Sequence, residues 1–315
     1  MTADIVIPAY KPGPKFIRQL EALCTQKVPV SKIIVINTEE AFFPSDLPER
    51  IPFPEQTAFE VHHITKADFD HAGARNLGAS YSDADVCIFM TDDAVPSDDD
   101  LIAELLKPFS DPEVGVVYAR QLPDEKAGIT ERFSRAFNYP VKSVKKTIED
   151  LPRLGIKTFF CSNVCAAYRR DLFDMCGGFE APAIFNEDMV LACGLIHRKK
   201  AVYYAADAKV THSHSYTNAQ QFSRNFDLAV SQAMHPEVFE EIRSESEGVR
   251  YVKAAFGYFV KKGRPFAVFP FLVTVVYRYL GFRLGKRYRT LSRKRILKVT
   301  MNPGFFRNLW EKNEG

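Results

Sequence analysis

The sequence has few of the features that mark secreted or metal-stabilised proteins. Six cysteines in 315 residues are too sparse for a disulfide framework. The C-x3-C spacing of Cys161 and Cys165, with no second close pair, is poor for a structural zinc site. No basic segment followed by an apolar stretch stands near the start, so we expect no secretory signal. We expect the cysteines to be small buried side chains in a reducing cytosol.

Long apolar runs and, in one region, acidic residues are also missing. The longest largely apolar run, residues 265–277, is shorter than the about 20 residues that a bilayer-spanning helix needs. Residues 251–310 hold 14 Lys and Arg but no Asp or Glu, whereas residues 1–250 hold 27 basic and 37 acidic residues. With 46% hydrophobic and 26% charged residues, the composition excludes a disordered chain. The sequence therefore predicts an acidic globular body followed by a basic region.

What the sequence does contain is an alternation of β-rich runs and helical patterns. Four runs predict strands, at residues 5–7, 33–36, 60–64 and 86–90. Helical patterns at residues 15–26 and 73–81 lie between them. This alternation predicts a doubly wound, mostly parallel α/β sheet that binds ligands beyond the carboxyl ends of its strands. Further short strands are expected at residues 114–118, 202–204 and 209–211. We expect one domain over residues 1–218 and a helical region over residues 219–315.

Two carboxylates, Asp92 and Asp93, directly follow the fourth predicted strand. Carboxylate oxygens are ligands for hard divalent cations, and such a cation offsets the charge of a nucleotide diphosphate. We favour a metal site here, with a solvated turn that caps the next helix as the alternative. Ser97 and the aspartates at 98–100 are instead expected to be the N-cap and first turn of a helix over residues 101–109.

Three further segments carry polar side chains at predicted strand ends or helix starts. Gly73 and Arg75 could let a helix start hold a phosphate, although this pair is common at helix starts. Glu187 and Asp188 are either an acidic helix start or a general base whose proton affinity its neighbour raises. His212 and His214 lie on one side of a predicted strand end, either as metal ligands or as ordinary histidines.

Together these segments resemble the inverting family 2 glycosyltransferases of GT-A fold, and within them the bacterial rhamnosyltransferases. The resemblance covers nearly the whole chain. Its main blocks are IVIPAY at residues 5–10, FDHAGARN at 69–76 and TDDAVP at 91–96. It continues in ARQLP at 119–123, RAFNYP at 135–140, CSN at 161–163 and AYRR at 167–170. The family usually has an Asp-x-Gly-Ser turn where this sequence reads NTEE at residues 37–40.

The resemblance implies a Rossmann-like nucleotide-binding half, an acceptor-binding half and a C-terminal helical extension. It implies that Asp188 is the catalytic base and that Asp93 and His212 hold Mn²⁺ or Mg²⁺, with His214 as a further candidate ligand. The implied donor-binding residues are Pro8, Ala9, Tyr10, Thr38, Glu39, His71, Arg75, Asn76 and Asp92. As acceptor-binding residues we expect Arg120, Gln121, Asn138, Tyr139 and Glu187, with ordinary packing as the equal alternative for the first four.

The activity that the resemblance implies is a one-step displacement with inversion. L-Rhamnose would pass from dTDP-β-L-rhamnose to a lipid-linked saccharide in cell-wall, capsule or O-antigen biosynthesis. The nearest alternative is a UDP-hexose or furanose donor, and the more distant one is an inactive sugar-nucleotide-binding protein. The aromatic and basic residues after 250 would hold the enzyme peripherally at the cytoplasmic membrane face, or would pack on the acidic body. Their apolar content argues against a nucleic-acid partner.

Overall fold

The computed structural model describes residues 1–240 and 245–314, which form two compact units. The first unit comprises residues 1–124, 139–181 and 187–212. The second comprises residues 125–138, 182–186 and the described residues from 213 onward. The second unit thus takes in two segments that precede residue 218, and the domain boundary expected there stays a prediction.

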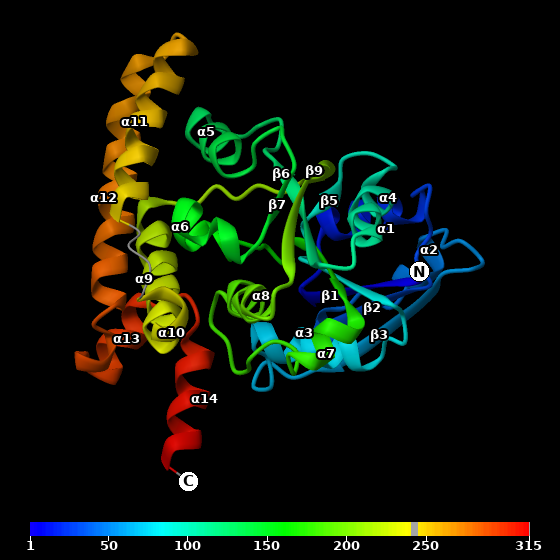
Figure 1. The fold of residues 1–315 in the computed structure, drawn as a ribbon. Coiled ribbons are helices and arrows are strands. Elements are labelled where there is room, and N and C mark those ends of the chain that lie inside the picture. Colours follow the sequence, from blue (N-terminus) through cyan, green and yellow to red (C-terminus); the bar gives the residue numbers. More distant parts are fainter. Residues whose placement is uncertain (241–244, 315) are drawn as a thin grey trace. The chain divides into compact units, whose positions relative to one another are not determined.

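A mixed sheet with helices on both faces forms the first unit (Figure 1). The strand order is β3-β2-β1-β4-β8-β6-β9-β5, and β7 pairs with β9. The first four strands pair in parallel, whereas β8 runs antiparallel to both β4 and β6. The α/β class predicted from the sequence is therefore confirmed. The strands are β1 Ala3–Tyr10, β2 Lys32–Thr38, β3 Ala58–Ile64, β4 Val86–Met90, β5 Val95–Pro96, β6 Val114–Leu122, β7 Val144–Lys146, β8 Cys165–Arg169 and β9 Ala201–Thr211.

Alternate residues of the central strands face the two helical layers. Ile5 and Ile7 of β1 belong to one core cluster with Phe16 of α1, whereas Val6 lies on the opposite face. There Gly78 of α3 comes so close that an added Cβ would lie 2.2 Å from the Val6 side chain. Both faces of β1 are thus buried, as expected for a central strand. The helices of this unit are α1 Pro14–Cys24, α2 Leu47–Arg50, α3 His71–Ser80, α4 Leu101–Leu106, α6 Leu151–Leu154, α7 Arg170–Met175 and α8 Glu187–His197.

The position of β1 in the sheet creates the expected binding edge. The chain runs from β1 outward through β2 to β3, and then returns to place β4 on the other side of β1. The connections beyond the carboxyl ends of β1 and β4 therefore diverge, which opens a crevice at that edge. Asp92 and Asp93 follow β4 at this edge, and the segment before β8 also reaches it, because Cys165 pairs with Met90.

Two expectations about local structure are wrong. Residues 202–204 and 209–211 belong to one strand, β9, whose pairing with β6 shifts register between Ala119 and Arg120. Ser97 is not an N-cap, because α4 begins at Leu101 with Asp100 at its N-cap position and no side-chain cap. The aspartates before α4 instead form ion pairs: Asp98 with Lys209 at 2.8 Å, and Asp100 with Lys27 at 2.9 Å.

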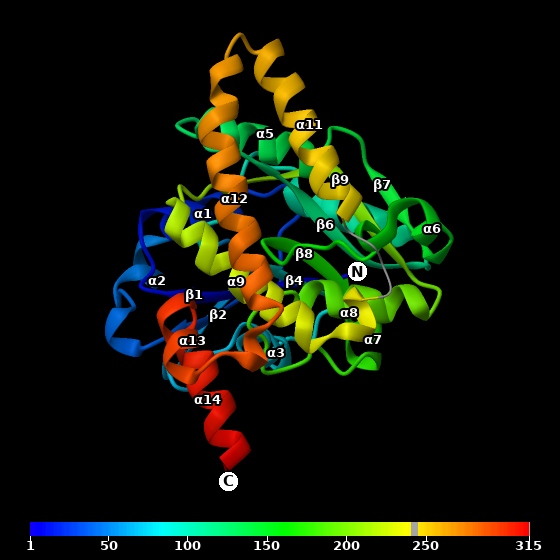
Figure 2. The same ribbon diagram turned by 90° about the vertical axis from the view of Figure 1, so that its left-hand side faces the viewer.

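The second unit is helical, as the sequence predicts from residue 219 onward. Two of its long helices, α9 and α12, pack against each other (Figure 2). The contact is close because Gly281 and Gly285 of α12 face the backbone of α9, where no side chain would fit. Phe133 of α5 and Phe271 of α12 share a buried cluster, so α5 belongs to this unit. The helices are α5 Ile129–Asn138, α9 Asn218–Met234, α10 Pro236–Phe239, α11 Glu245–Lys261, α12 Val268–Gly285, α13 Arg293–Val299 and α14 Pro303–Glu314.

Replacing Gly281 with alanine is expected to destabilise the second unit by about 2–3 kcal/mol. The new Cβ would lie 2.1 Å from the Phe222 carbonyl oxygen of α9, so the two helices would have to separate. Urea unfolding followed by circular dichroism measures the change. Gly257→Ala on α11 is the matched control, because a Cβ there meets no atom within 4 Å. Alanine also favours helix there, so that variant should be unchanged or slightly more stable; equal losses in the two variants would contradict the packing account.

The apolar run predicted to be too short to span a bilayer is part of a longer helical segment. Within the described residues, one segment, Pro265–Gly285, is long and apolar enough by length and composition to cross a membrane. Only 11% of its most apolar window is buried. Several large apolar side chains of α11, the turn before α12, and α12 are exposed: Phe256, Val260, Phe266, Phe269, Leu272, Val273, Val276, Tyr277, Tyr279 and Leu280.

Candidate active site

Asp92 links the ends of two neighbouring strands in the first unit. It follows β4, and its carboxylate accepts a hydrogen bond from the backbone N–H of Tyr10, at the end of β1, at 3.3 Å. Burial raises the pKa of Asp92 to about 6. The negative charge of the neighbouring Asp93 adds to the rise, whereas the hydrogen bond from the Tyr10 N–H opposes it. Asp92 therefore lies where the predicted donor-binding segment 8–10 ends.

Asp93 faces His212, although 118 positions separate them in the sequence. After β4 the chain forms β5, and Val95 of β5 pairs with Thr211 at the end of β9. This pairing brings the turn at Asp93 beside the residue that follows β9. The Asp93 Oδ1 and His212 Nε2 atoms lie 3.3 Å apart, and both side chains are largely buried. The structure therefore brings the two predicted metal ligands together.

Gln121 of β6 favours the tautomer of the His212 ring in which Nδ1 carries the proton. Its amide Nε2 donates to the Tyr139 hydroxyl at 2.5 Å and to the Ser162 hydroxyl at 2.9 Å. The amide oxygen then faces His212 Nδ1 at 3.1 Å and accepts a hydrogen bond from its N–H. In the neutral ring, Nε2, the atom toward Asp93, then carries the lone pair, which is the tautomer a metal ligand needs.

The Asp93–His212 pair fits a divalent cation. Mn²⁺ and Mg²⁺ accept carboxylate oxygen, and Mn²⁺ also accepts imidazole nitrogen. Ligand atoms at adjacent corners of an octahedron with bonds of about 2.1 Å lie about 3 Å apart, close to the observed separation. Without a cation, the same contact requires a protonated Nε2 that donates to the Asp93 carboxylate. The donor set and the tautomer both suit a metal ion.

Glu187 and Asp188 begin α8 and meet the segment before β8. The backbone N–H of Asn163 donates to Asp188 Oδ2 at 3.1 Å, and its side-chain Nδ2 donates to Glu187 Oε1 at 3.1 Å. The other Asp188 oxygen accepts from the Met189 N–H at 2.8 Å. The guanidinium of Arg75 lies 3.1 Å from the same Glu187 oxygen. The acidic pair is thus fixed by hydrogen bonds at the edge where β4 ends.

The two carboxyls of this pair differ in proton affinity. Burial raises the pKa of Asp188 to about 7, and the negative charge of Glu187 adds to the rise. Burial opposes ionisation of Glu187 as well, but the charges of Arg75 and His71 and the amide of Asn163 outweigh it and lower its pKa. Glu187 is therefore the ionised member and Asp188 the one that exchanges a proton near neutral pH.

The helix start at residues 70–76 is used differently from the donor-binding expectation. Asp70 caps α3 by accepting from the N–H groups of Ala72 and Gly73, and Gly73 leaves room for that carboxylate. Arg75, only 4% exposed, donates to the His71 carbonyl at 2.8 Å and pairs with Glu187. Arg75 Nε is buried without a protein partner. Its predicted contact with the donor, like that of His71, stays a prediction.

Asn76 holds a loop of the same unit. Its amide donates to the carbonyl of Phe179 at 2.7 Å and accepts from the Phe179 N–H at 2.9 Å. Gly178 in this loop has a φ of 75°, and a Cβ there would lie 2.8 Å from the Asn76 amide oxygen. Asn76 therefore shapes the loop before α8, and its predicted contact with the donor stays a prediction.

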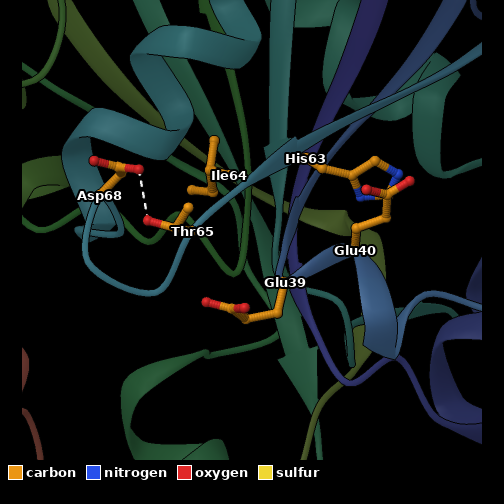
Figure 3. A pocket seen from close by; sticks show the side chains of 6 residues that line it. All are labelled: Glu39, Glu40, His63, Ile64, Thr65 and Asp68. Carbon is orange, nitrogen blue, oxygen red and sulfur yellow. Dashed lines mark hydrogen bonds between the residues drawn. The ribbon is translucent and has the colours of Figure 1, made fainter.

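A pocket of about 460 Å³ lies beyond the carboxyl ends of β2 and β3 (Figure 3). Glu39, which has a φ of 65°, contributes its side chain to the wall and accepts from the Lys66 N–H at 2.6 Å. Next to it in sequence, the buried Thr38 hydroxyl has no protein partner. The sequence identified Glu39 and the neighbouring Thr38 but not the rest of the wall, most of which lies at the end of β3 or just after it. The lining residues are Glu39, Glu40, His63, Ile64, Thr65 and Asp68.

The predicted acceptor-binding residues fall in both units. Gln121 is 2% exposed and Tyr139 is similarly buried, and both support His212, a role that the sequence did not suggest. Arg120 has a buried Nε without a protein partner. Asn138 is the last residue of α5, which belongs to the second unit. The candidate metal ligand His214 belongs to the second unit as well. There the His214 N–H donates to Glu131 at 3.2 Å, and its ring stacks on Tyr216.

Asn163 is the functional residue that sequence reasoning did not assign. It was only part of the CSN block, yet it contacts both carboxylates of the acidic pair. Its neighbour Ser162 accepts from Gln121, which orients His212. Adjacent residues thus join the candidate metal site and the candidate base. The sequence did contain a signal for Asn163. Ser162 and Asn163 are a polar pair just before an apolar strand, and Asp92 and Asp93 are a polar pair just after one.

Two curated proteins are similar to this chain over most of its length. O-antigen chain rhamnosyltransferase RfbN from Salmonella typhimurium is 36% identical over 312 residues, which is 98% of this chain and 97% of that protein. O-antigen chain rhamnosyltransferase WbaN from Salmonella anatum is 36% identical over 248 residues, 78% of each chain.

Solved structures share the fold at low identity. The mannosyltransferase PcManGT from Pyrobaculum calidifontis, in complex with GDP-Man and Mn²⁺, has a TM-score of 0.56 at 15% identity and covers 98% of this chain and 87% of its own. TarS residues 1–349 from S. aureus, in complex with UDP-GlcNAc, has a TM-score of 0.52 at 12% identity over 92% of each chain. Residues 4–177 also match the domain of glycosyl transferase family 2. This chain therefore belongs to glycosyl transferase family 2 and is a glycosyltransferase of the GT-A fold.

Proposed function

We propose that the protein transfers L-rhamnose, with inversion, from dTDP-β-L-rhamnose to a lipid-linked saccharide acceptor. The identity of 36% to two proteins named O-antigen chain rhamnosyltransferases supports the sugar. The donor nucleotide and the lipid-linked acceptor rest on the resemblance of the FDHAGARN and TDDAVP blocks. A UDP-hexose or furanose donor is the alternative that the experiment below separates.

One observation carries this proposal. The adjacent residues Ser162 and Asn163 contact, respectively, the Gln121 side chain behind His212 and the carboxylate of Asp188. The candidate metal ligands and the candidate base therefore belong to one site in the first unit. A cation for the diphosphate and a base for the acceptor hydroxyl at one strand edge are what an inverting sugar transfer requires.

In this proposal, Asp93 and His212 hold Mn²⁺ or Mg²⁺. His214 is the third candidate ligand, because it follows His212 by two positions and its Cα therefore lies at most about 7 Å from that of His212. The bound ion would offset the negative charge of the diphosphate leaving group. Asp92, whose carboxylate accepts from the Tyr10 N–H, would orient the nucleotide rather than bind the ion.

Asp188 acts in this proposal as the general base. Its carboxylate takes the proton of the acceptor hydroxyl while that oxygen attacks the anomeric carbon from the face opposite the diphosphate. The hydrogen bonds from the Asn163 and Met189 N–H groups fix the carboxylate in one orientation. Glu187 stays ionised beside Arg75 and takes no part in the proton transfer.

The pocket beside Glu39 is proposed to receive the nucleoside of the donor. It lies beyond the strand ends where nucleotides bind in doubly wound sheets. The polar side chains of Glu39, Glu40 and Thr65 in its wall are available to polar groups of a base or sugar. Ring contacts between Tyr10 and Phe42 provide an aromatic surface nearby, with 5.8 Å between their centroids.

A panel of nucleotide sugars tests the proposed function. The purified chain is assayed with dTDP-rhamnose, UDP-glucose, UDP-N-acetylglucosamine and GDP-mannose, each with Mn²⁺, Mg²⁺ or EDTA. We expect metal-dependent turnover of dTDP-rhamnose at a rate at least tenfold above the other donors. Efficient use of UDP-glucose without dTDP-rhamnose would overturn the donor assignment, and full activity in EDTA would overturn the metal assignment.

Turnover is expected to fall as the pH drops below about 7. Burial and the charge of Glu187 raise the pKa of Asp188 to about 7, and only the ionised carboxylate can accept a proton. The rate should therefore increase with pH through this value and level off above it. The measurement is kcat/KM from pH 5.5 to 8.5 at saturating metal. A rate that stays flat down to pH 5.5 would contradict the assignment of Asp188.

The second unit is proposed to hold the enzyme at the cytoplasmic face of an anionic membrane. Exposed aromatic and aliphatic side chains on α12 accompany a region with 14 basic and no acidic residues. The segment Pro265–Gly285, which contains α12, is also long enough to cross the bilayer. However, α9 packs along α12 and carries Arg224 and Asp227. Taking these charges into hydrocarbon is unfavourable, so we favour an interfacial position.

Vesicle sedimentation tests this membrane proposal. The protein is expected to bind vesicles that contain about one third phosphatidylglycerol and to bind pure phosphatidylcholine weakly. Replacing Phe266 and Phe269, 80% and 63% exposed, with glutamate should lower binding at least tenfold, because buried aromatic area is lost and charge is reversed. Val141→Glu, an exposed apolar residue of the first unit, is the control. Equal binding of the variant with both Phe266 and Phe269 replaced and of the wild type would contradict the proposal.

A further inference from the structure

Asn163 contacts both carboxylates of the acidic pair while itself being only 3% exposed. Its backbone N–H donates to Asp188 Oδ2 and its amide Nδ2 to Glu187 Oε1, each at 3.1 Å. A side chain this buried has little surface for a sugar or a nucleotide. Its influence on the reaction therefore has to pass through the residues that it contacts.

The Tyr168 hydroxyl fixes which way the Asn163 amide points. It donates to the amide oxygen Oδ1 at 2.8 Å, which leaves the NH₂ group toward Glu187. Burial raises the pKa of Tyr168 far above its usual range, so this hydroxyl stays a donor at every relevant pH. Tyr168 belongs to β8, a fully paired strand between β4 and β6, so the arrangement rests on the sheet.

The other groups around the pair act on it unequally. Arg75 donates to the same Glu187 oxygen as Asn163, and His71 of α3 adds positive charge near Glu187. Cys161 lies near Asp188, but burial raises its pKa to about 12, so it stays a neutral thiol. Two donors thus converge on Glu187, whereas Asp188 receives backbone N–H groups alone and no cation within hydrogen-bond distance among the described contacts.

We propose that Asn163 is a positioning residue that keeps Glu187 ionised and aims the Asp188 carboxylate, so that Asp188 is the member of the pair that takes the acceptor proton. The inference rests on the proposed function, in which Asp188 is the base. Without the Asn163 amide, Glu187 loses a donor and competes for the proton, whereas the backbone N–H of residue 163 still holds Asp188. Tyr168 serves the same purpose one step further away.

The test is the pH profile of Asn163→Asp. Aspartate keeps the shape and the acceptor for Tyr168, but replaces the donor to Glu187 with a negatively charged oxygen. Like-charge repulsion should raise the midpoint of the acid limb of kcat/KM by about one pH unit. At pH 7 this is a loss of about fivefold if the midpoint moves from 7 to 8. Glu187→Gln removes a like charge and should move the midpoint the opposite way. The KM for the donor should change less than twofold in both.

Gln26→Glu is the matched control. Gln26 is also buried and bonded through its amide, to the carbonyls of Ala22 and Asp98, and touches neither carboxylate of the pair. Its midpoint should equal that of the wild type. If Asn163→Asp does not fold, Tyr168→Phe takes its place, because it removes only the hydroxyl that orients the amide. It should lower kcat about threefold to tenfold at unchanged donor KM.

The outcomes separate this inference from the proposed function. An unshifted midpoint and wild-type kcat in folded Asn163→Asp, or full activity in Tyr168→Phe, would overturn the role of Asn163. A loss of thermal stability with an unshifted midpoint would show a purely structural role and would overturn it as well. Substantial activity in Asp188→Asn would overturn the proposed base itself, whatever the result at Asn163.

Discussion

Replacing Asp188 with asparagine is expected to lower kcat by a factor of about 10³. The amide has nearly the shape of the carboxylate, but it cannot accept the proton of the acceptor hydroxyl. Donor binding should be preserved, because Asp188 is held by the N–H groups of Asn163 and Met189 and acts on the acceptor. Steady-state turnover and the Kd of the nucleotide, measured by calorimetry, check both statements.

Two results would contradict this role of Asp188. Activity above about one tenth of the wild type would show that another group takes the proton. A protein that binds the nucleotide sugar but shows no turnover even as wild type would favour the rival hypothesis of an inactive binding protein. Glu180→Gln, at an exposed residue of the same unit, provides a control for the chemical change itself.

Asp93→Asn is expected to have the second large effect, on metal affinity and on turnover together. At an effective dielectric constant of about 20, a charge pair at 4 Å contributes about 4 kcal/mol for unit charges, so loss of the carboxylate should weaken Mn²⁺ binding at least a hundredfold. Turnover at moderate Mn²⁺ should fall by a similar factor and recover in part at high Mn²⁺. Electron paramagnetic resonance of unbound Mn²⁺ gives the affinity independently of activity.

The control for Asp93 is Asp98→Asn. Asp98 lies five positions further along, and its carboxylate pairs with Lys209 at 2.8 Å. As a partly exposed ion pair it contributes little, so the variant should keep its metal affinity and its turnover within about twofold. Unchanged Mn²⁺ affinity in Asp93→Asn, or equal losses in both variants, would contradict the assignment of the metal site.

The sequence predicted the parts of the fold that depend on short-range pattern. The buried runs at Ile5 and Ile33 are central strands because their residues are apolar on both faces. The placement of Asp92 and Asp93 at the binding edge followed from the rule that ligands lie beyond strand ends. The C-terminal helices followed from composition and period alone.

What the sequence did not predict depends on contacts between distant segments. The antiparallel pairing of Cys165 with Met90 brings Asn163 to the edge, and no local pattern marks that return. Gln121 was assigned to the acceptor because its block matched a family motif, but its amide is hydrogen-bonded behind His212. Ser97 was expected as an N-cap because serine is favoured at that position. The aspartates that follow it instead pair with lysines 27 and 209, which lie far away in sequence.

Arg75 shows that a motif residue can make a contact within the protein that its position does not suggest. Its place at a helix start suggested a phosphate ligand, since helix starts favour anions. In the structure its guanidinium meets an anion of the protein itself, Glu187, which lies 112 positions away in the sequence. The pairing couples the block at residues 69–76 to the acidic pair, which single-sequence reasoning could not foresee.

The central claim is that Asp93, His212 and Asp188 belong to one site around an activated sugar. A crystal structure with Mn²⁺ and dTDP, with anomalous scattering used to locate the ion, tests it most directly. We expect an anomalous peak within about 2.3 Å of both Asp93 Oδ1 and His212 Nε2, with the terminal phosphate on the side of Asp188. A peak bound elsewhere, or a nucleotide whose diphosphate points away from Asp188, would contradict the account.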